Sequence, residues 1–403
     1  MDFQATDDAV TRRVKFFTDR ERMLRENDLY FYNQPVEEIK GGARVIVNGR
    51  EMGMYASYGY LGLLGHPRIN AAAKAAIDKF GTGTNGVRTL AGSLTIHTEL
   101  EETIAAFKHA EAAITYSSGY ATNLTVISTL MGRGDFVISD KLNHASIVDG
   151  CIMSGAEFRR FKHNDMAELE RRLQQVPGDA AKLVVADAVF SMDGDVLDLP
   201  KTAELCKKYH AWLMIDEAHS VGVLGRTGRG IEEHFGLGDV VDIKMGTLSK
   251  TIPSVGGYVA GKKELIQYLR HASRAYIFSA ALPPAQAAAA NEAFKVILDE
   301  PWRIDKVNAN GRQFIDGLKK AGFDTMLTTT AIVPVLCGTD ERAFALTRTC
   351  QHQDLFVLPV VSPAVPEGLS RLRATVTAAH EPQEIDYALG VIEKAGRQIG
   401  IIQ

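Results

Sequence analysis

Short, almost wholly apolar segments alternate with longer segments of helical character between residues 112 and 215. The apolar segments are 112–116, 135–139, 182–186 and 211–215. The predicted helices of the same stretch are 119–131, 146–154, 165–174 and 200–209. Strands that are buried on both faces carry continuous apolar runs, and strands joined through helices usually pair in parallel. The sequence therefore predicts an α/β fold in which a mostly parallel central sheet lies between helices.

The composition of the chain changes at two places. Residues 8–29 carry apolar side chains at helical spacing, and a strand, an Asn48-Gly49 turn and a second strand follow them. An alanine-rich segment at 282–290 begins a long helix that ends before Pro301. We expect an N-terminal helix and strand arm (1–54), a large domain (55–290) and a smaller C-terminal α+β domain (291–403).

The charges of the chain are balanced and dispersed. Its 45 Lys and Arg residues and 49 Asp and Glu residues are mixed along the sequence and give a net charge of -4. A nucleic-acid partner is not expected, because a binding surface for it needs clustered basic residues. The N-terminus lacks the apolar core of a signal peptide, and no apolar run is long enough to span a membrane. We expect a cytoplasmic protein without an integral membrane segment that acts on small molecules.

The cysteines and one glycine-rich segment could indicate a metal site, a redox dithiol or a dinucleotide-binding loop, but none of these is expected. Cys151, Cys206, Cys337 and Cys350 have no paired spacing, so neither a metal site nor a redox dithiol is expected. The segment Gly81-Thr-Gly-Thr-Asn-Gly86 has the three glycines of a dinucleotide-binding loop. It follows a predicted helix, however, whereas the dinucleotide loop follows a strand.

One lysine lies among small hydroxyl residues and glycines. Lys250 follows the apolar segment 240–245 and precedes a Gly256-Gly257 turn. This order places it on a loop at an edge of the sheet, where ligands of open α/β sheets usually bind. A lysine there can form a Schiff base while the neighbouring hydroxyls hold an anionic group such as a phosphate. Taken alone, the residue would more often be a solvated loop lysine.

A carboxylate and a histidine follow another apolar strand, in Asp216-Glu-Ala-His219. A carboxylate at the end of a buried strand can pair with a cationic nitrogen, such as the pyridinium of pyridoxal phosphate (PLP). His219 could then hydrogen-bond the phenolic oxygen of the same cofactor. In isolation, the motif is equally compatible with a metal-binding Asp-x-x-His pair or a helix cap.

Further polar groups follow neighbouring strands. His144 could stack on a planar cofactor or donate to a reacting carbonyl, although a lone histidine is more often structural. Ser118, Gly119 and Tyr120 begin a helix directly after a strand, and the free N–H groups of such a helix start favour phosphate. Ser191 follows the next strand along the chain. Together these strand ends supply a complete set of groups for holding PLP.

The order of the motifs resembles that of the α-oxoamine synthase family of fold-type-I PLP-dependent enzymes, from about Tyr55 to the C-terminus. The matching motifs are Tyr60-Leu-Gly-Leu63, Asn143-His-Ala-Ser146, Phe190-Ser-Met-Asp-Gly-Asp195, Asp216-Glu-Ala-His219, Gly246-Thr-Leu-Ser-Lys250, and the segment from Leu372-Arg373 through Ala378-Ala-His380. The resemblance implies a fold-type-I transferase, an enzyme that uses PLP, and a homodimer with shared active sites.

The resemblance also implies a role for individual residues. Lys250 would form the internal aldimine and move the α-proton, and Asp216 would pair with the pyridinium nitrogen. His219 would contact the phenolic oxygen, and His144 would stack on the ring. The cofactor-binding residues that it implies are Ser118, Gly119, Tyr120, His144, Ser191, Asp216, His219, Thr247, Ser249, Lys250 and Ser279. Of these, Ser279 would reach the phosphate across the dimer interface.

The reaction implied by the resemblance is a decarboxylative Claisen condensation. An α-amino acid and an acyl thioester, of CoA or of acyl carrier protein, would give an α-amino ketone, CO2 and a free thiol. Arg373 would hold the amino-acid carboxylate through its planar fork. Tyr58 and the segments 88–92 and 359–366 resemble the serine palmitoyltransferase branch, so L-serine is the first expected amino acid. A synthase that uses glycine or alanine would have almost the same sequence, and Gly59 stands where members usually carry Asn or Asp.

Two other functions share most of these groups. A PLP-dependent aminotransferase uses the same cofactor-binding residues on the same fold. A catalytically silent partner subunit could also keep the fold, but the presence of Lys250 argues against it.

Overall fold

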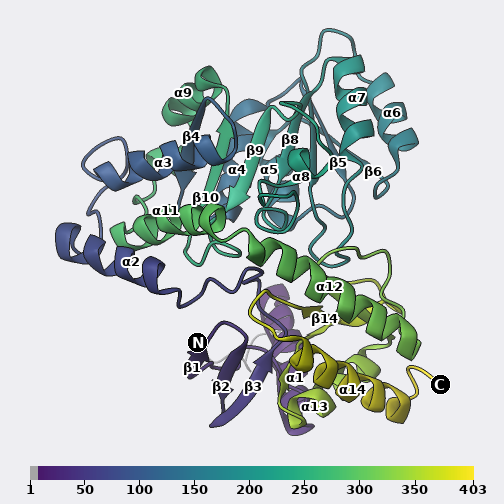
Figure 1. Ribbon diagram of the computed structural model, residues 1–403. Coiled ribbons are helices and arrows are strands. Elements are labelled where there is room, and N and C mark those ends of the chain that lie inside the picture. Colours follow the sequence, from purple (N-terminus) through teal and green to yellow (C-terminus); the bar gives the residue numbers. More distant parts are fainter. Residues whose placement is uncertain (1–7) are drawn as a thin grey trace.

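The structure, a computed structural model, describes residues 8–403, and its centre is a seven-stranded sheet (Figure 1). The strands lie in the order β4 (Ala112–Tyr116), β10 (Gly257–Gly261), β9 (Ile243–Thr247), β8 (Trp212–Asp216), β7 (Lys182–Asp187), β5 (Phe136–Asp140) and β6 (Glu157–Phe161). β10 is antiparallel to β4 and β9, whereas the strands from β9 to β6 pair in parallel. The predicted mostly parallel sheet is confirmed.

Apolar cores cover both faces of this sheet. Along β7, Val184 and Ala186 belong to one core, whereas Leu183 and Val185 belong to the other. One core receives side chains from α2 (Pro67–Phe80), α3 (Thr95–Phe107), α6 (Met166–Gln174), α7 (Leu199–Tyr209), α8 (Ile231–His234) and α11 (Pro284–Asp299). The other receives them from α4 (Gly119–Leu130), α5 (Ala145–Ser154), α9 (Lys263–Ala272) and α10 (Arg274–Ile277). Within residues 8–403, no helix has both the length and the apolar character needed to cross a membrane.

The C-terminal part of the chain has its own antiparallel sheet. Its strands are β11 (Ile332–Gly338), β14 (Ser370–Thr375) and β13 (Pro359–Val360), and its helices are α12 (Trp302–Ala321), α13 (Asp340–His352) and α14 (Pro382–Ile399). The N-terminal arm supplies α1 (Ala9–Glu26) and the strands β1 (Glu38–Lys40), β2 (Arg44–Val47) and β3 (Arg50–Met54). Strand β12 (Leu355–Phe356) joins the arm by pairing with β3, so the two parts lie together below the large sheet (Figure 1). The division of the chain at residues 54 and 290 stays a prediction.

Strand β6 is missing from the elements predicted from the sequence. It occupies residues 157–161, between the helices predicted at 146–154 and 165–174, where the sequence predicts no element. Among residues 8–403, β6 lies at the edge of the sheet and pairs with β5 alone, and of its own residues only the last, Phe161, is buried. An edge strand needs no continuous apolar run, and the sequence Glu-Phe-Arg-Arg-Phe therefore lacks the signal of a buried strand.

The turn at residues 190–195 approaches β11 so closely that it requires glycine. Gly194 has a φ angle of +72°, and a Cβ at this position would lie 2.1 Å from the carbonyl oxygen of Ile332. The same Cβ would lie 2.4 Å from Oγ1 of Thr328. A side chain can be accommodated here only if the turn and β11 move apart.

We expect Gly194→Ala to lower the free energy of unfolding by about 2 kcal/mol, because the Cβ would overpack a buried contact and hold a left-handed backbone conformation. Urea denaturation measures the change. Gly238→Ala is the control, since a Cβ there meets nothing within 4 Å, and it should change stability by less than about 0.5 kcal/mol. Equal stability of Gly194→Ala and the wild type would contradict the close approach.

Candidate active site

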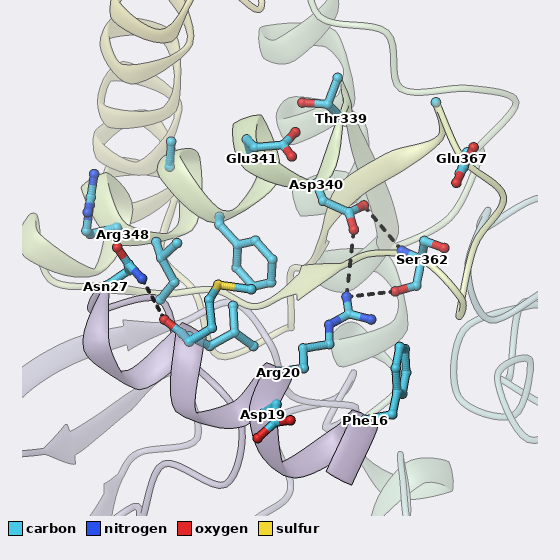
Figure 2. Close-up of a pocket in the computed structure, with 16 residues that line it drawn as sticks. Phe16, Asp19, Arg20, Asn27, Thr339, Asp340, Glu341, Arg348, Ser362 and Glu367 are labelled. Carbon is cyan, nitrogen blue, oxygen red and sulfur yellow. Dashed lines mark hydrogen bonds and ion pairs between the residues drawn. The ribbon is translucent and has the colours of Figure 1, made fainter. Parts of the chain in front are cut away.

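A spacious cavity in the described part of the chain contains none of the predicted groups. It has a volume of about 1020 Å³ and lies between α1, the start of α13 and residues 362–368 (Figure 2). In this cavity Nη2 of Arg20 lies 3.0 Å from the carbonyl oxygen of Ser362 and 3.7 Å from Oδ2 of Asp340. No residue predicted to bind cofactor or substrate lines it.

A second cavity, of about 270 Å³, lies at the carboxyl ends of β5, β7, β8 and β9. The predicted residues that line it are Ser118, Gly119, Tyr120, His144, Ser191, Asp216, His219, Thr247, Ser249 and Lys250. They come together because parallel strands end at the same edge of a sheet, and the loops that follow the strands therefore share one crevice. The glycine-rich loop 81–86 does not line this cavity.

Lys250 is one end of a buried hydrogen-bonded chain. Its Nζ lies 2.8 Å from Nε2 of His219, and Nδ1 of His219 lies 2.5 Å from the hydroxyl of Tyr60. Burial lowers the pKa of His219 well below 6.5, so its imidazole is neutral. Burial also raises the pKa of Tyr60 to about 12, so the phenol keeps its proton. A neutral imidazole donates on one nitrogen and accepts on the other, so His219 can accept from a protonated Lys250 or donate to a neutral one.

The amine of Lys250 is unusually easy to deprotonate. Burial lowers the pKa of Lys250 to about 8; the carboxyl groups of Asp216 and Asp187 oppose this effect, and Arg373 adds to it. A lysine is nucleophilic only in its neutral form, and desolvation is a known way to increase the neutral fraction near neutral pH. The site therefore contains an amine suited to attack a carbonyl group.

Asp216 is held in a fixed orientation at the end of β8. Nδ2 of Asn123, on α4, donates to Oδ2 of Asp216 at 2.7 Å, and the amide of Ala218 donates to Oδ1 at 2.9 Å. Asn123 donates its second proton to Oγ of Ser146 at 2.9 Å. The carboxylate is thus positioned for a cation at the floor of the cavity.

A second carboxyl group lies beside it. Asp187 ends β7 and is the register partner of Asp216 across the two strands. Its Oδ2 accepts the amide proton of His144 at 3.1 Å, whereas its buried Oδ1 has no hydrogen-bond partner among the described residues. Burial and the nearby charge of Asp216 raise the pKa of Asp187 well above 3.8. Two neighbouring buried carboxyl groups disfavour a state in which both are ionised, so Asp187 keeps its proton to higher pH than an ordinary aspartate does.

His144 presents a defined tautomer to the cavity. Its Nδ1 lies 3.2 Å from the amide nitrogen of Ser146 and 2.7 Å from Oγ of the same residue. Because the amide can only donate, Nδ1 is the acceptor and Nε2 carries the ring proton. The ring lines the cavity at the start of α5, where it can pack against a planar ligand.

The part of the cavity at the start of α4 is suited to an anion. Ser118 caps α4 through a hydrogen bond from the amide of Ala121 at 3.1 Å. The hydroxyls of Thr247 and Ser249 lie 2.9 Å apart, and a Cβ on Gly119 would lie 3.1 Å from Oγ1 of Thr247. The start of a twelve-residue helix, beside two hydroxyl groups, is a geometry that binds phosphate.

The C-terminal part contributes Arg373, on β14. Its Nε donates to the carbonyl oxygen of Ser191 at 2.6 Å, and its Nη1 donates to Oγ1 of Thr375 at 3.0 Å. Its Nη2 is buried and has no acceptor among residues 8–403. The guanidinium carbon lies 4.7 Å from the ring centre of Tyr58, and Nζ of Lys250 lies 5.6 Å from the same centre. Arg373 and Lys250 therefore both lie against the ring of Tyr58, and the charge of Arg373 helps to lower the pKa of Lys250.

Ser279 is the one predicted cofactor-binding residue that does not line the cavity. It follows α10, is partly buried, and precedes Ala280, which forms an isolated bridge with Val87. Within a single chain it does not contribute to the site, and its role across a dimer interface stays a prediction.

Three residues of the site were not recognised in the sequence: Asn123 and Asp187, which line the cavity, and Tyr60, which contacts His219 behind it. Tyr60 lies within a matched motif, but its contact with His219 joins residues 159 positions apart. Asn123 is on a predicted helix and carries no local signal. Asp187 could have been found, because it is a carboxylate at the end of an apolar strand, as Asp216 is.

Comparisons with known proteins agree with this geometry. The family model described as aminotransferase class I and II matches residues 55–392. The 8-amino-7-oxononanoate synthase of Thermoanaerobacter pseudethanolicus is 44% identical over 391 residues, which cover 93% of this chain and 99% of that protein. The 8-amino-7-oxononanoate synthase 1 of Bacillus subtilis is 40% identical over 393 residues, which cover 98% of this chain and 100% of that protein.

Solved structures give the same class. A serine palmitoyltransferase variant from S. paucimobilis with a bound PLP-myriocin aldimine has a TM-score of 0.95 and 36% identity, with 98% of this chain and 100% of that chain covered. The 8-amino-7-oxononanoate synthase of Francisella tularensis has a TM-score of 0.75 and 26% identity, and the match covers 86% of this chain and 98% of that chain.

The fold and these matches define a fold-type-I, PLP-dependent transferase. More narrowly, the chain belongs to the α-oxoamine synthase family, whose members are PLP-dependent acyl-condensing enzymes. The family, the fold class, the cofactor and the enzyme class predicted from the sequence are confirmed.

The pKa of Lys250 leads to a prediction about cofactor loading. The rate at which the apoprotein takes up PLP should rise with pH up to about 8 and level off above it, because only the neutral amine attacks the aldehyde. Below this midpoint the rate should fall about tenfold per pH unit. Stopped-flow absorbance measures the rate.

Asp216→Asn tests the contribution of the neighbouring carboxylate to the pKa of Lys250. The substitution removes a carboxylate that raises the pKa of Lys250, so the midpoint should move to lower pH. A midpoint near 10.5 in the unaltered protein would instead indicate a solvated lysine.

Proposed function

We propose that this α-oxoamine synthase condenses L-alanine with an acyl thioester and releases CO2 and the free thiol. The observation that carries the condensation is the environment of Lys250, whose amine contacts His219 and shares the ring of Tyr58 with Arg373, a residue that has an unused donor. A proton-transferring amine and a carboxylate-binding group are the two protein functions that this reaction needs at the amino acid.

The choice of alanine is supported by the relatives that are 40–44% identical over nearly their whole length. Their name specifies a product with an amine at C8 and a ketone at C7 of a nine-carbon acid. The two carbons at C8 and C9 correspond to alanine after loss of its carboxyl group. The other seven carbons correspond to an acyl group with a second carboxylate at its far end. The acyl donor proposed here is therefore a seven-carbon dicarboxylic thioester, of CoA or of acyl carrier protein.

L-Serine, the amino acid expected from the sequence, remains the second candidate. It is supported by the serine palmitoyltransferase from S. paucimobilis, whose structure superimposes with a TM-score of 0.95, against 0.75 for the 8-amino-7-oxononanoate synthase of Francisella tularensis. Higher identity over the full length favours alanine, since the structural match concerns a fold that both branches share.

The residues of the cavity fit PLP. The start of α4 at Ser118, Gly119 and Tyr120, with the hydroxyls of Thr247 and Ser249, would hold the phosphate. The carboxylate of Asp216 would pair with the ring nitrogen, His144 would pack on the ring, and His219 and Ser191 would contact its phenolic side. When bound, PLP supplies an electron sink for a carbanion at the α-carbon of the amino acid.

The side chains then have separate tasks in the reaction. Arg373 binds the carboxylate of the amino acid beside Tyr58 and so orients the bonds at its α-carbon. Lys250 takes the α-proton, and His219, hydrogen-bonded to Tyr60, stabilises either protonation state of the amine. The α-carbon forms a bond to the thioester carbonyl, and the thiolate leaves and takes a proton. The carboxyl group leaves as CO2, and a proton returned to the α-carbon gives the α-amino ketone.

A homodimer with shared active sites completes this proposal. Ser279 lies away from the cavity of its own chain, in a segment bridged to the loop 81–92. Both segments expose large apolar side chains, with Phe278 72% and Leu90 84% exposed. A second copy of the chain would cover these side chains and bring Ser279 to a phosphate in its partner.

A panel of substrates tests the proposal. Alanine, serine and glycine are added to the PLP-loaded enzyme, and the absorbance change of the cofactor gives each Kd. Free thiol is then measured with CoA and acyl-carrier-protein thioesters of the seven-carbon dicarboxylic acid and of palmitate. Alanine with the dicarboxylic thioester should give the highest kcat/KM. Serine with palmitate as the best pair would favour the second candidate, and conversion of PLP to its amine form without thioester would indicate an aminotransferase.

Arg373→Ala should raise the KM for the amino acid by about tenfold to a hundredfold, because a charge-assisted contact with the carboxylate is lost. The KM for the thioester should change by less than about threefold. Arg348→Ala, at a residue that lines the other cavity, is the control and should change neither value. A larger effect on the thioester than on the amino acid would assign Arg373 to the acyl donor.

A further inference from the structure

We propose that His163 is a positioning residue for binding of the amino acid, because it fixes the turn at residues 190–195 that orients Arg373. This inference rests on the proposed function, in which Arg373 binds the substrate carboxylate. Its physical basis is a series of contacts that runs from β5, through the turn, to β14.

His163 lies between two carboxylates. It follows β6, with Nδ1 3.1 Å from Oδ1 of Asp140 and Nε2 2.8 Å from Oδ2 of Asp195. The side chain of Asp140 is 0% exposed and that of Asp195 is 9% exposed. Burial alone would lower the pKa of His163, but the hydrogen bonds and charges of the two carboxylates raise it to about 10. His163 is therefore an imidazolium that donates from both nitrogens, whereas a neutral imidazole, with a single N–H, could donate to only one of the two carboxylates.

The bridge fixes the turn at both of its ends. Asp195 provides the carboxylate at one end, and its carbonyl oxygen accepts the amide proton of Phe190 at 3.1 Å. The ring of Phe190, at the other end, packs edge-on against His163, with ring centres 4.3 Å apart. Asn164 adds a contact from the same loop, since its Nδ2 donates to the carbonyl oxygen of Val196 at 2.9 Å.

The turn then holds Arg373 through its backbone. The carbonyl oxygen of Ser191 accepts from Nε of Arg373 at 2.6 Å, which sets the plane of the guanidinium group. Gly194 accepts from Oγ1 of Thr330 at 2.9 Å, and Asp193 forms an ion pair with Arg371 on β14. With Nε and Nη1 occupied, the direction of the unused Nη2 depends on where the turn lies.

The cofactor end of the cavity is built without this turn, apart from Ser191. Asp216 ends β8, His219 follows it and Lys250 follows β9. Their hydrogen bonds go to one another and to Tyr60, Asn123 and Ala218. Loosening of the turn should therefore weaken amino-acid binding far more than PLP binding. A residue that merely stabilised the large domain would weaken both.

The test uses the PLP-loaded enzyme and two variants, His163→Gln and Asp195→Asn. The first removes the bridging cation, and the second leaves one of its two contacts, so a usable protein remains if the first does not fold. The Kd of L-alanine and of L-serine is measured from the absorbance change of the cofactor, and the Kd of PLP from equilibrium dialysis. His271→Gln is the matched control, at an exposed histidine on α9 whose Nδ1 lies 2.8 Å from the carbonyl oxygen of Gln267, within the same helix.

We expect the amino-acid Kd to rise about tenfold in His163→Gln and by a smaller factor in Asp195→Asn. The PLP Kd should change by less than about threefold in both, and His271→Gln should match the wild type. Unchanged amino-acid Kd values in the variants would overturn the inference. Loss of PLP binding in equal proportion, or failure of both variants to bind PLP, would also overturn it.

Arg373→Gln separates failure of this inference from failure of the proposed function. If Arg373→Gln weakens amino-acid binding and the His163 and Asp195 variants do not, only the positioning role is wrong. If Arg373→Gln leaves the amino-acid Kd unchanged, the proposed role of Arg373 is wrong and the inference fails with it.

Discussion

A buried amine in contact with a neutral imidazole is the interaction on which this site depends. Lys250 follows β9 and His219 follows β8, and the parallel register of these strands brings their loops together. Burial has two effects here, because it lowers the pKa of the lysine to about 8 and keeps the histidine neutral. The same contact in water would leave a protonated lysine, so the covered sheet edge is what gives Lys250 its reactivity.

The second constraint is that the site uses both parts of the chain. The large sheet supplies the lysine, the carboxylates and the helix start, whereas Arg373 comes from β14 of the C-terminal sheet. The turn at 190–195 connects them, and it can do so only because Gly194 allows close approach to β11. Substrate binding is therefore sensitive to contacts between the two parts, while most cofactor contacts lie within one of them.

The sequence predicted elements and site residues where a local pattern carries the information. Lys250, Asp216 and His144 follow apolar strands, so their meeting at one sheet edge could be predicted from the alternation of strands and helices. Strand β6 could not be predicted, because an edge strand has no need of apolar residues. The contacts of Tyr60 with His219 and of Asn123 with Asp216 join distant positions of the chain, so they required the structure.

The central claim is that Lys250 is the lysine that binds PLP. Borohydride reduction of the PLP-loaded protein, followed by digestion and mass spectrometry, tests it directly, because the reduced bond fixes the cofactor to the lysine that held it. We expect a pyridoxyl group on the peptide that contains Lys250 and no modified lysine in a Lys250→Ala variant. A modification on another lysine, or none in protein that retains bound PLP, would contradict it.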